Sequence, residues 1–266
     1  LRLPVLDGAL VVNTFAALGL GSDEPELAFD ARLEPIELRR LTAAFGWPAF
    51  SGSLSGELPM LSLQDGVITV GGSLVAHAFD GTVRISDLRI DDPFRPARRG
   101  TASIAIDNLD LRRLTEVFSF GHMEGRLDGY VNDLQTFRGR PIAFDARFFT
   151  PVGDRSRRRI SRRALNNISD IAGGGTALLS TSFLRFFEEF SYESIGIGCR
   201  LDRDVCHMSG VEPTSGGYFL VRGRSLPRID VIGHAQQVNW PRLLAQIEKA
   251  LEGRDAPPAE TEEVPK

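Results

Sequence analysis

Arginines crowd into residues 155–163 (RSRRRISRR), and this cluster is the strongest candidate for polar chemistry. Its members are Arg155, Arg157, Arg158, Arg159, Arg162 and Arg163. Guanidinium groups bind phosphates, so the cluster could contact anionic lipid headgroups at a membrane surface, where each basic residue adds ~1 kcal/mol. Two other interpretations stay open. The arginines could bind nucleic acid, although no aromatic residues interleave with them to stack on bases, or they could form a solvated face whose stems cover apolar surface.

The two cysteines are the second candidate for chemistry. Cys199 and Cys206 lie in Ile195–Val211 (IGIGCRLDRDVCHMSGV), which is typical of a hairpin turning at Asp202-Arg203. Such a turn places the cysteines directly opposite each other at Cα separations of ~4.5–5.5 Å, within reach of a disulfide. We predict a cross-strand disulfide, which would indicate an oxidising compartment. The alternative is a pair of free buried thiols.

Other reactive residue types form no recognisable site. The histidines have no metal-ligand spacing; they are His77, His122, His207 and His234. Residues 173–175 (GGG) lack the lysine and spacing of a phosphate-binding loop, and neither a nucleophile elbow nor a dinucleotide fingerprint is present. We therefore expect no metal, no cofactor and no enzymatic activity.

The composition indicates an ordered protein with an unusual aromatic bias. The chain has 266 residues, 42% of them hydrophobic, and a net charge of −4. This apolar content supports a core and excludes global disorder, and no stretch approaches the ~20 apolar residues of a membrane span. Phe accounts for 17 aromatic residues, against 3 Tyr and 2 Trp. Because the chain starts at Leu1 with structured-looking sequence, we expect a fragment of a longer chain, with a disordered acidic tail at 253–266.

The elements that must position these residues are mostly strands. Short apolar alternations recur between turn signals. Asp-Gly pairs are strong hairpin signals because both residues tolerate positive φ, and they occur at 7–8, 65–66, 80–81 and 128–129. The pattern predicts a mainly β protein with short helices, built on a long antiparallel meander.

An internal repeat organises this meander. Leu38–Leu61 and Leu111–Leu134 align without gaps and are identical at ten positions, including the helix start L-R-R-L-T. Each copy predicts a strand, a short helix and a G-x-L-x-G strand, giving repeat units at 27–61 and 103–134. Repeats of this kind build elongated sheets, so we expect residues 1–252 to form one elongated domain.

Helices are expected at two further places. A helical insertion at 157–190 should contain an amphipathic helix carrying Ile160, Ala164, Leu165, Ile168 and Ile171, and then a Phe-rich helix over Thr176–Phe190. A degenerate third repeat copy leads from a strand at Ile229–Gly233 into a helix at Trp240–Leu251, with Pro241 suited to the first helical turn.

The order of these elements resembles the AsmA-like proteins of Gram-negative envelopes, and within them the C-terminal, dicarboxylate-transport-labelled region of the YdbH type. The matching segments are Leu61–Gly72 (LSLQDGVITVGG), Leu111–Gly129, Ala164–Phe190 and Ile195–Gly217. The resemblance covers roughly residues 1–252. It implies a curved antiparallel sheet that forms an apolar groove, capped by short helices, and a periplasmic bridge that carries phospholipid between the two membranes. It also implies a membrane anchor elsewhere in the full chain, and an end near the outer membrane that pairs with a small lipoprotein.

A lipid groove needs an apolar sheet face that is not consumed by a core, because acyl chains gain ~0.8 kcal/mol per buried CH₂. Alternating strands supply one such face. The candidate groove residues are Val83, Ile85, Ile104, Ile106, Ile142, Phe144, Phe219 and Val221. The alternative for each is ordinary packing beneath the helices or against a second layer.

Two other functions stay open beside a non-catalytic lipid conduit. The sheet could be a scaffold whose edge takes a strand from a partner, such as an outer-membrane lipoprotein or assembly factor. A carbohydrate- or dicarboxylate-binding β domain is weaker, because no Trp or Tyr cluster supports it. Nucleic acid is not an expected partner.

Overall fold

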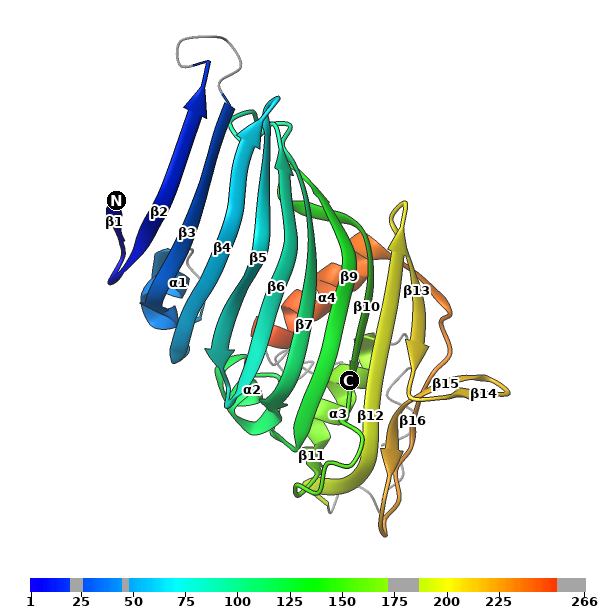
Figure 1. Ribbon diagram of the computed structural model, residues 1–266. Helices are drawn as coiled ribbons and strands as arrows, with labels where there is room; N and C mark the ends of the chain where they lie inside the picture. The colour runs from blue at the N-terminus through cyan, green and yellow to red at the C-terminus, as the bar shows by residue number, and fades with distance from the viewer. Residues whose placement is uncertain (20–25, 45–47, 172–186, 253–266) are drawn as a thin grey trace, which may run out of the picture.

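A computed structural model describes residues 1–19, 26–44, 48–171 and 187–252, and it is mainly β, with 60% strand and 16% helix. One large antiparallel sheet dominates it and does not close into a barrel (Figure 1). Its strands, in order of pairing, are β1 (Arg2–Val5), β2 (Gly8–Leu18), β3 (Glu26–Glu37), β4 (Gly52–Gln64), β5 (Val67–Ala78), β6 (Gly81–Asp91), β7 (Arg99–Asp110), β9 (Arg126–Phe137), β10 (Arg140–Phe149), β12 (Glu189–Asp202), β13 (Val205–Gly210) and β17 (Gln237–Asn239).

A smaller group of strands branches from the long strand β12. The C-terminal half of β12 pairs with β10 and β13 in the large sheet, whereas its N-terminal half pairs with β11 and β15. The strands of this group are β8 (Met123–Glu124), β11 (Arg159–Ser161), β14 (Pro213–Thr214), β15 (Gly217–Gly223) and β16 (Val231–Gly233). β12 therefore joins the large sheet to a compact C-terminal region.

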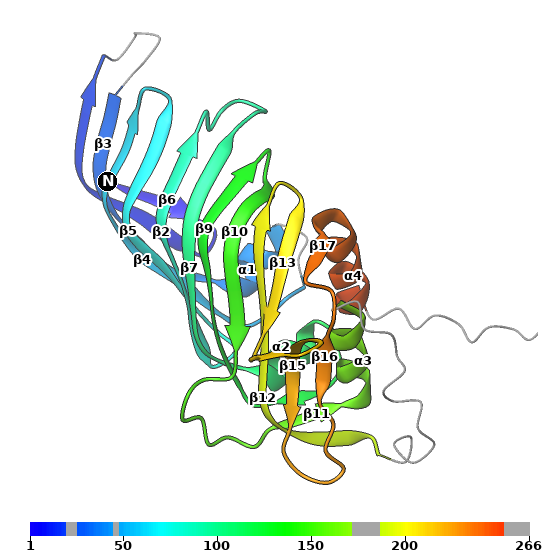
Figure 2. The same cartoon turned by 90° about the vertical axis from the view of Figure 1, so that its right-hand side faces the viewer.

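In the described part of the chain, four helices lie on one face of the large sheet, which bends toward the side that carries them (Figures 1 and 2). They are α1 (Leu38–Ala44), α2 (Leu111–Val117), α3 (Arg162–Ile171) and α4 (Trp240–Glu252). The two repeat copies fold alike, because β3 leads through α1 into β4 and β7 leads through α2 into β8 and β9. The predicted strand–helix–strand unit is confirmed in both copies.

Equivalent residues of the two repeat copies have the same burial and the same backbone conformation. Leu38 and its counterpart Leu111 are 4% and 3% exposed, and each begins its helix buried against the sheet. The first strand after each helix starts near a glycine of unusual conformation, Gly52 with φ +135° and Gly125 with φ +134°. Side chains rarely tolerate that region, so the shared glycines have a backbone reason.

The Asp-Gly turn predictions hold at three of the four sites. β1–β2, β4–β5 and β5–β6 all turn at or next to their Asp-Gly pair. The fourth prediction is wrong, because Asp128 and Gly129 lie inside β9. There the Asp128 carboxylate accepts a hydrogen bond from the backbone N–H of Asn108 at 2.8 Å, and Gly129 lies opposite Phe148 of β10. The pair serves cross-strand packing instead of a turn.

The helical insertion differs in part from its prediction. α3 forms over Arg162–Ile171, but Ile160 precedes it in β11. Most of the predicted helix Thr176–Phe190 lies outside the described residues, as do the glycines at 173–175 and the tail at 253–266. The described end of that predicted helix is not helical, because Phe190 belongs to β12 and pairs with Ile160. In the degenerate third copy, β16 and α4 form as expected, with β17 between them.

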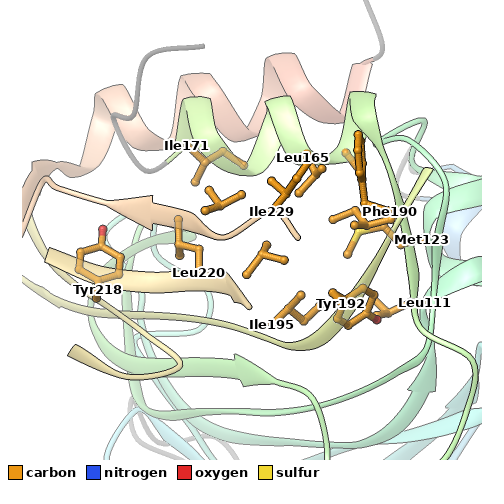
Figure 3. Packing of buried hydrophobic residues seen from close by; sticks show 14 of the residues in the cluster. Leu111, Met123, Leu165, Ile171, Phe190, Tyr192, Ile195, Tyr218, Leu220 and Ile229 are labelled. Atoms are coloured by element: carbon orange, nitrogen blue, oxygen red, sulfur yellow. The ribbon is translucent and has the colours of Figure 1, made fainter. Parts of the chain in front are cut away.

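The hydrophobic core lies in the C-terminal region, where α2, α3 and α4 cover the small strands (Figure 3). Its largest fully buried side chains include Tyr192, Ile160, Leu165 and Leu220. Within the described residues, every member of this cluster lies at Leu111 or beyond. The apolar side chains of β1 to β7 therefore serve some purpose other than filling this core.

Candidate functional site: an apolar sheet face

Apolar residues line up in two unbroken rows across the strands on the helix-bearing face, which we call the apolar face. The first row, from β1 to β13, is Leu3, Leu10, Leu33, Gly56, Leu74, Ile85, Ile104, Val131, Ala146, Cys199 and Met208. The second, from β3 to β13, is Ile36, Leu54, Ala76, Val83, Ile106, Gly129, Phe148, Ile197 and Gly210. Neighbours in a row are direct cross-strand partners, whose side chains share one face.

The middle of this face is only half-buried. Leu74, Ile85, Ile104 and Val131 all keep intermediate exposure. Core aliphatic residues of this size are usually fully buried, and Leu165 in α3 is 1% exposed. Within the described residues, no second layer seals the centre of the apolar face.

The opposite face of the sheet carries polar side chains, so successive residues along a strand point alternately to the apolar face and to this polar face. Arg84 of β6 is exposed and lies between the row members Val83 and Ile85, and Asp107 of β7 is exposed directly after the row member Ile106. A β-bulge keeps the apolar residues together farther along β6, where Asp87 has φ +54° and the pairing shifts between Ser86 and Arg89. Bulges re-aim the following side chains, so Leu88 returns to intermediate exposure while Asp87 is exposed.

Repeat-equivalent glycines shape the rows. A Cβ on Gly56 would lie 2.8 Å from Leu74 Cδ2, and one on Gly129 would lie 2.7 Å from the Phe148 ring. Contacts this short are not tolerated, so each glycine makes room for a large side chain from the next strand. The repeat thus determines where small and large side chains alternate across the apolar face.

One end of the apolar face deepens into a cavity of about 370 Å³ beneath α2, α3 and α4, which we call the helix-covered cavity. Its walls include Leu114 of α2 and Phe118 directly after it, Phe148 and Ile197 of the second row, and Leu251 of α4. Its volume is within the ~300–1,000 Å³ typical of ligand pockets. The lining is almost wholly apolar, so the cavity suits a hydrocarbon and offers nothing to a charged group.

The one hydroxyl in this lining is already satisfied. Thr115 is 7% exposed, and its Oγ1 donates to the carbonyl of Leu111 at 2.8 Å and accepts from the N–H of Met123 at 3.3 Å. A buried hydroxyl with both roles filled has little left to offer a ligand.

The predicted groove residues fall into two groups. Val83, Ile85, Ile104 and Ile106 all belong to the two rows, where they are mutual cross-strand partners. The remaining four do not share that patch.

Phe144 lies on the apolar face but is covered at one edge by Trp240, whose ring centroid is 5.3 Å away. Ile142 is 41% exposed, beside an irregularity in the β9–β10 pairing. Phe219 lies in β15 with Arg222 4.3 Å over its ring. Val221 is 1% exposed within the core cluster, so its assignment to an open groove is corrected. β15 belongs to the small sheet that the helices cover.

The arginine cluster is divided among three elements. Arg158 is the most enclosed, with a side chain 13% exposed, and it pairs with Asp154 and with the backbone carbonyl of Glu193. Arg157 and Arg159 pair with Glu124 at 3.2 Å and Glu189 at 3.0 Å.

Arg155 is exposed before β11, and Arg162 and Arg163 are exposed at the start of α3 and make interactions of their own. The middle of the cluster thus ties the loop to β8 and β12 through ion pairs and a backbone contact.

The cysteines form the predicted disulfide in a hairpin that turns one residue later than predicted. Cys199 and Cys206 are bonded, with their Cα atoms 5.4 Å apart. The turn residues are Arg203 and Asp204, with φ +46° and +61°. Cys199 therefore lies opposite Met208, and the two cysteines are diagonal neighbours instead of direct partners.

Titratable groups give no sign of a reactive centre. Among the described residues, no group of three or more His, Cys, Asp or Glu side chains is arranged to hold a metal ion. Burial raises the pKa of Tyr218 to about 12, and it raises the pKa of Tyr192 further. Their hydroxyls donate to the carbonyls of Ala235 at 3.0 Å and Glu124 at 2.7 Å. Both tyrosines are thus neutral structural groups.

Comparisons with protein-family models, curated proteins and solved structures found no match for the chain. No helix in the described part of the chain is long and apolar enough to span a membrane. The sequence reasoning missed two features: the helix-covered cavity and a polar pocket between α1 and α2. The available signal for the second was the repeated L-R-R-L-T motif, which places arginines at equivalent positions of both helices.

Proposed function

We propose that the chain is a non-catalytic segment of a lipid conduit, in which acyl chains of phospholipid lie along the apolar face. The observation that carries the proposal is the pair of unbroken apolar rows, whose central residues keep intermediate exposure and lie outside the core cluster. Contiguous apolar surface of this kind on a soluble fold marks a site for an apolar partner.

The dimensions favour a path over a single pocket. The first row crosses from β1 to β13, and strands ~4.8 Å apart give it a length of about 50 Å. An acyl chain segment of about eight methylenes laid along it gains roughly 6 kcal/mol from burial. Because the row offers equivalent contacts at each strand, a chain can shift along it while keeping most of that gain.

The AsmA-like resemblance extends this proposal to the cell envelope. We accordingly propose a location in the periplasm of a Gram-negative bacterium, as part of a bridge that carries phospholipid to the outer membrane and contributes to outer-membrane biogenesis. The Cys199–Cys206 disulfide supports an oxidising compartment.

Site-specific photo-crosslinking tests the conduit. A benzophenone side chain at Ile104 lies on the apolar face, whereas one at Ala105 lies on the same strand but points to the polar face, opposite Arg84. With radiolabelled phospholipid vesicles, we expect lipid adducts at residue 104 and few at residue 105. Equal labelling at both positions would refute the proposal.

A scaffold that accepts a partner strand is the second candidate function. β1 pairs only with Gly8–Val11 of β2, so within the described residues the stretch Asn13–Leu18 has a strand on one side only. Such an edge can accept a strand from a small outer-membrane lipoprotein. Ala16→Pro in β2 should abolish capture of that lipoprotein and leave phospholipid crosslinking at residue 104 intact. Capture of the lipoprotein that survives Ala16→Pro would rule out strand addition at this edge.

A further inference from the structure

A pocket of about 460 Å³ lies at the C-terminal corner of the large sheet, where β13 and β17 meet the β14–β15 hairpin, and we call it the arginine pocket. Arg147 and Ser209 in its lining alternate with members of the apolar rows along β10 and β13. Their side chains therefore point to the polar face, so the sheet separates this pocket from the apolar face. The polar side chains that line it are Arg147, His207, Ser209, Glu212, Gln236 and Gln237.

A glycine makes room in this pocket. Arg147 of β10, Gly198 of β12 and Ser209 of β13 are direct cross-strand partners, with Gly198 in the middle. A Cβ on Gly198 would collide with the Oγ atom of Ser209. The missing side chain thus leaves space on the polar face between the guanidinium of Arg147 and the hydroxyl of Ser209.

The charge of Arg147 is not balanced by the protein. The side chain keeps intermediate exposure, yet its Nε atom is buried and has no hydrogen-bond partner in the described part of the chain. Among the described residues, no carboxylate forms an ion pair with Arg147. Glu212 is the acid in the pocket lining, and its Oε1 already pairs with Nη1 of Arg222 at 2.8 Å. Partial desolvation of an uncompensated charge is costly, so an anion bound here would relieve it.

One end of the guanidinium remains available to a ligand. Its Nη2 atom donates to the carbonyls of Gly210 and Val211 at 3.4 Å and 3.5 Å, which are long for hydrogen bonds. The Phe149 ring centre lies 5.7 Å from the guanidinium carbon. Since both carbonyls share Nη2, the Nη1 atom has no acceptor within the described residues.

Neutral hydrogen-bonding groups complete the lining. β17 places Gln237 directly opposite His207 of β13, and Gln236 precedes it. Together with the Ser209 hydroxyl, the two amides and the imidazole can donate to an oxyanion without adding a fixed charge. The pocket therefore combines one uncompensated cation with several neutral donors.

We propose that the arginine pocket binds the carboxylate of a small soluble organic acid, held by the guanidinium of Arg147 and the hydroxyl of Ser209. The rest of the acid lies against Gln236 and Gln237. Guanidinium and carboxylate groups form strong charge-assisted hydrogen bonds. This site is independent of the lipid conduit, because the two lie on opposite faces of the sheet.

The charge of the lining favours a carboxylate over a phosphate ester. One uncompensated guanidinium balances the single charge of a carboxylate. A phosphate ester carries about −1.5 to −2 at neutral pH, and its excess charge would lie in a pocket that also contains the Glu212 carboxylate.

Nuclear magnetic resonance titration of the whole chain tests the assignment. The probes are propionate, propionamide, which has the same shape but no charge, and inorganic phosphate. Arg147→Gln removes the cation, and Ser209→Ala removes the hydroxyl at an exposed position. The matched control is Arg200→Gln, because Arg200 is exposed on the polar face of β12, opposite His207, but does not line the pocket.

We expect propionate to give saturable shifts of the Arg147 Nε–H and Ser209 amide resonances, and propionamide to give none. Followed at the residue 209 amide, Arg147→Gln should weaken propionate binding at least about tenfold and Ser209→Ala several-fold, since hydrogen bonds to charged groups are the stronger ones. Arg200→Gln should leave the affinity within about twofold of wild type.

The opposite results overturn the site. They are the absence of saturable shifts with propionate, equal shifts with propionamide, or unchanged affinity in a folded Arg147→Gln variant. If Arg147→Gln does not fold by circular dichroism, unchanged affinity in Ser209→Ala overturns the binding mode instead. Tighter binding of phosphate than of propionate overturns the carboxylate assignment and identifies a phosphate site.

Discussion

Truncating a leucine on the apolar face should cost far less stability than truncating one in the core. The comparison is Leu74→Ala in β5, at the centre of the first row, against Leu165→Ala in α3. If the apolar face is open, as the half-exposure of Leu74 indicates, its side chain has only part of the burial of a core residue.

The two magnitudes follow from exposure and from the space left behind. Leu165 is 1% exposed, and removing a buried leucine costs about 3–4 kcal/mol because it loses transfer free energy and leaves a cavity. Full burial of a leucine is worth about 1.5–3 kcal/mol, so Leu74, which keeps intermediate exposure, forfeits about 1–2 kcal/mol. No cavity term applies at Leu74, because its surroundings are already open to solvent.

Urea unfolding followed by far-ultraviolet circular dichroism measures both free energies. Alanine also weakens strand propensity, an effect of up to ~1 kcal/mol. Val75→Ala, on the polar face of the same strand opposite Arg84, supplies that correction. The corrected cost at Leu74 should stay below half of that at Leu165.

A corrected cost at Leu74 equal to that at Leu165 would show that something covers the apolar face, and the reasoning behind the conduit would fail. A second measurement sharpens the contrast. Added phospholipid should raise the stability of wild type by more than that of Leu74→Ala, because ligand binding stabilises the folded state by mass action.

Three further predictions concern the framework. Gly125→Ala should cost about 2 kcal/mol or more in urea unfolding, since its φ is +134°, whereas Gly66→Ala in an open turn with nothing within 4 Å should cost less. Burial alone would raise the pKa of Asp154, but hydrogen bonds from Ser156 and the ion pair with Arg158 lower it overall. Its stabilisation is therefore present above about pH 4 and lost as pH falls further, so Asp154→Asn should flatten the acid limb of stability; an unchanged limb contradicts this. Replacing Cys199 and Cys206 by Ala should cost about 2 kcal/mol, the chain-entropy value for so short a loop, and reductant should then have no further effect.

The local pattern of the sequence was sufficient to predict the class of fold. Alternation, turn residues and the L-R-R-L-T repeat each report on a few neighbouring residues, and the β-rich chain, three Asp-Gly hairpins and the helices α1 and α2 follow from them. Four groove residues in β6 and β7 were also predictable, since regular strands joined in sequence keep their register.

Features that depend on register or on distant pairing were not predictable. The cysteine hairpin turns at Arg203 and Asp204, which both take positive φ, and a one-residue change of turn cannot be seen in alternation. Val221 alternates like a row member, yet β15 pairs with the far half of β12 and enters the core. The β-bulge at Asp87 was not predictable either, because it shifts the register between β6 and β7 while the apolar pattern of the sequence continues.

The repeat explains why the apolar face stays open. α1 and α2 have seven residues each, a length of about 10 Å, whereas β3 and β7 have twelve, about 40 Å. Each helix therefore covers only about a quarter of the strand that precedes it and leaves the rest of the row uncovered. A longer helix would seal the face and turn it into a core, as α3 and α4 do at the C-terminal region. Every repeat copy consequently adds apolar strands that it does not cover, so the exposed rows are a direct product of the repeat length and lengthen with each added unit.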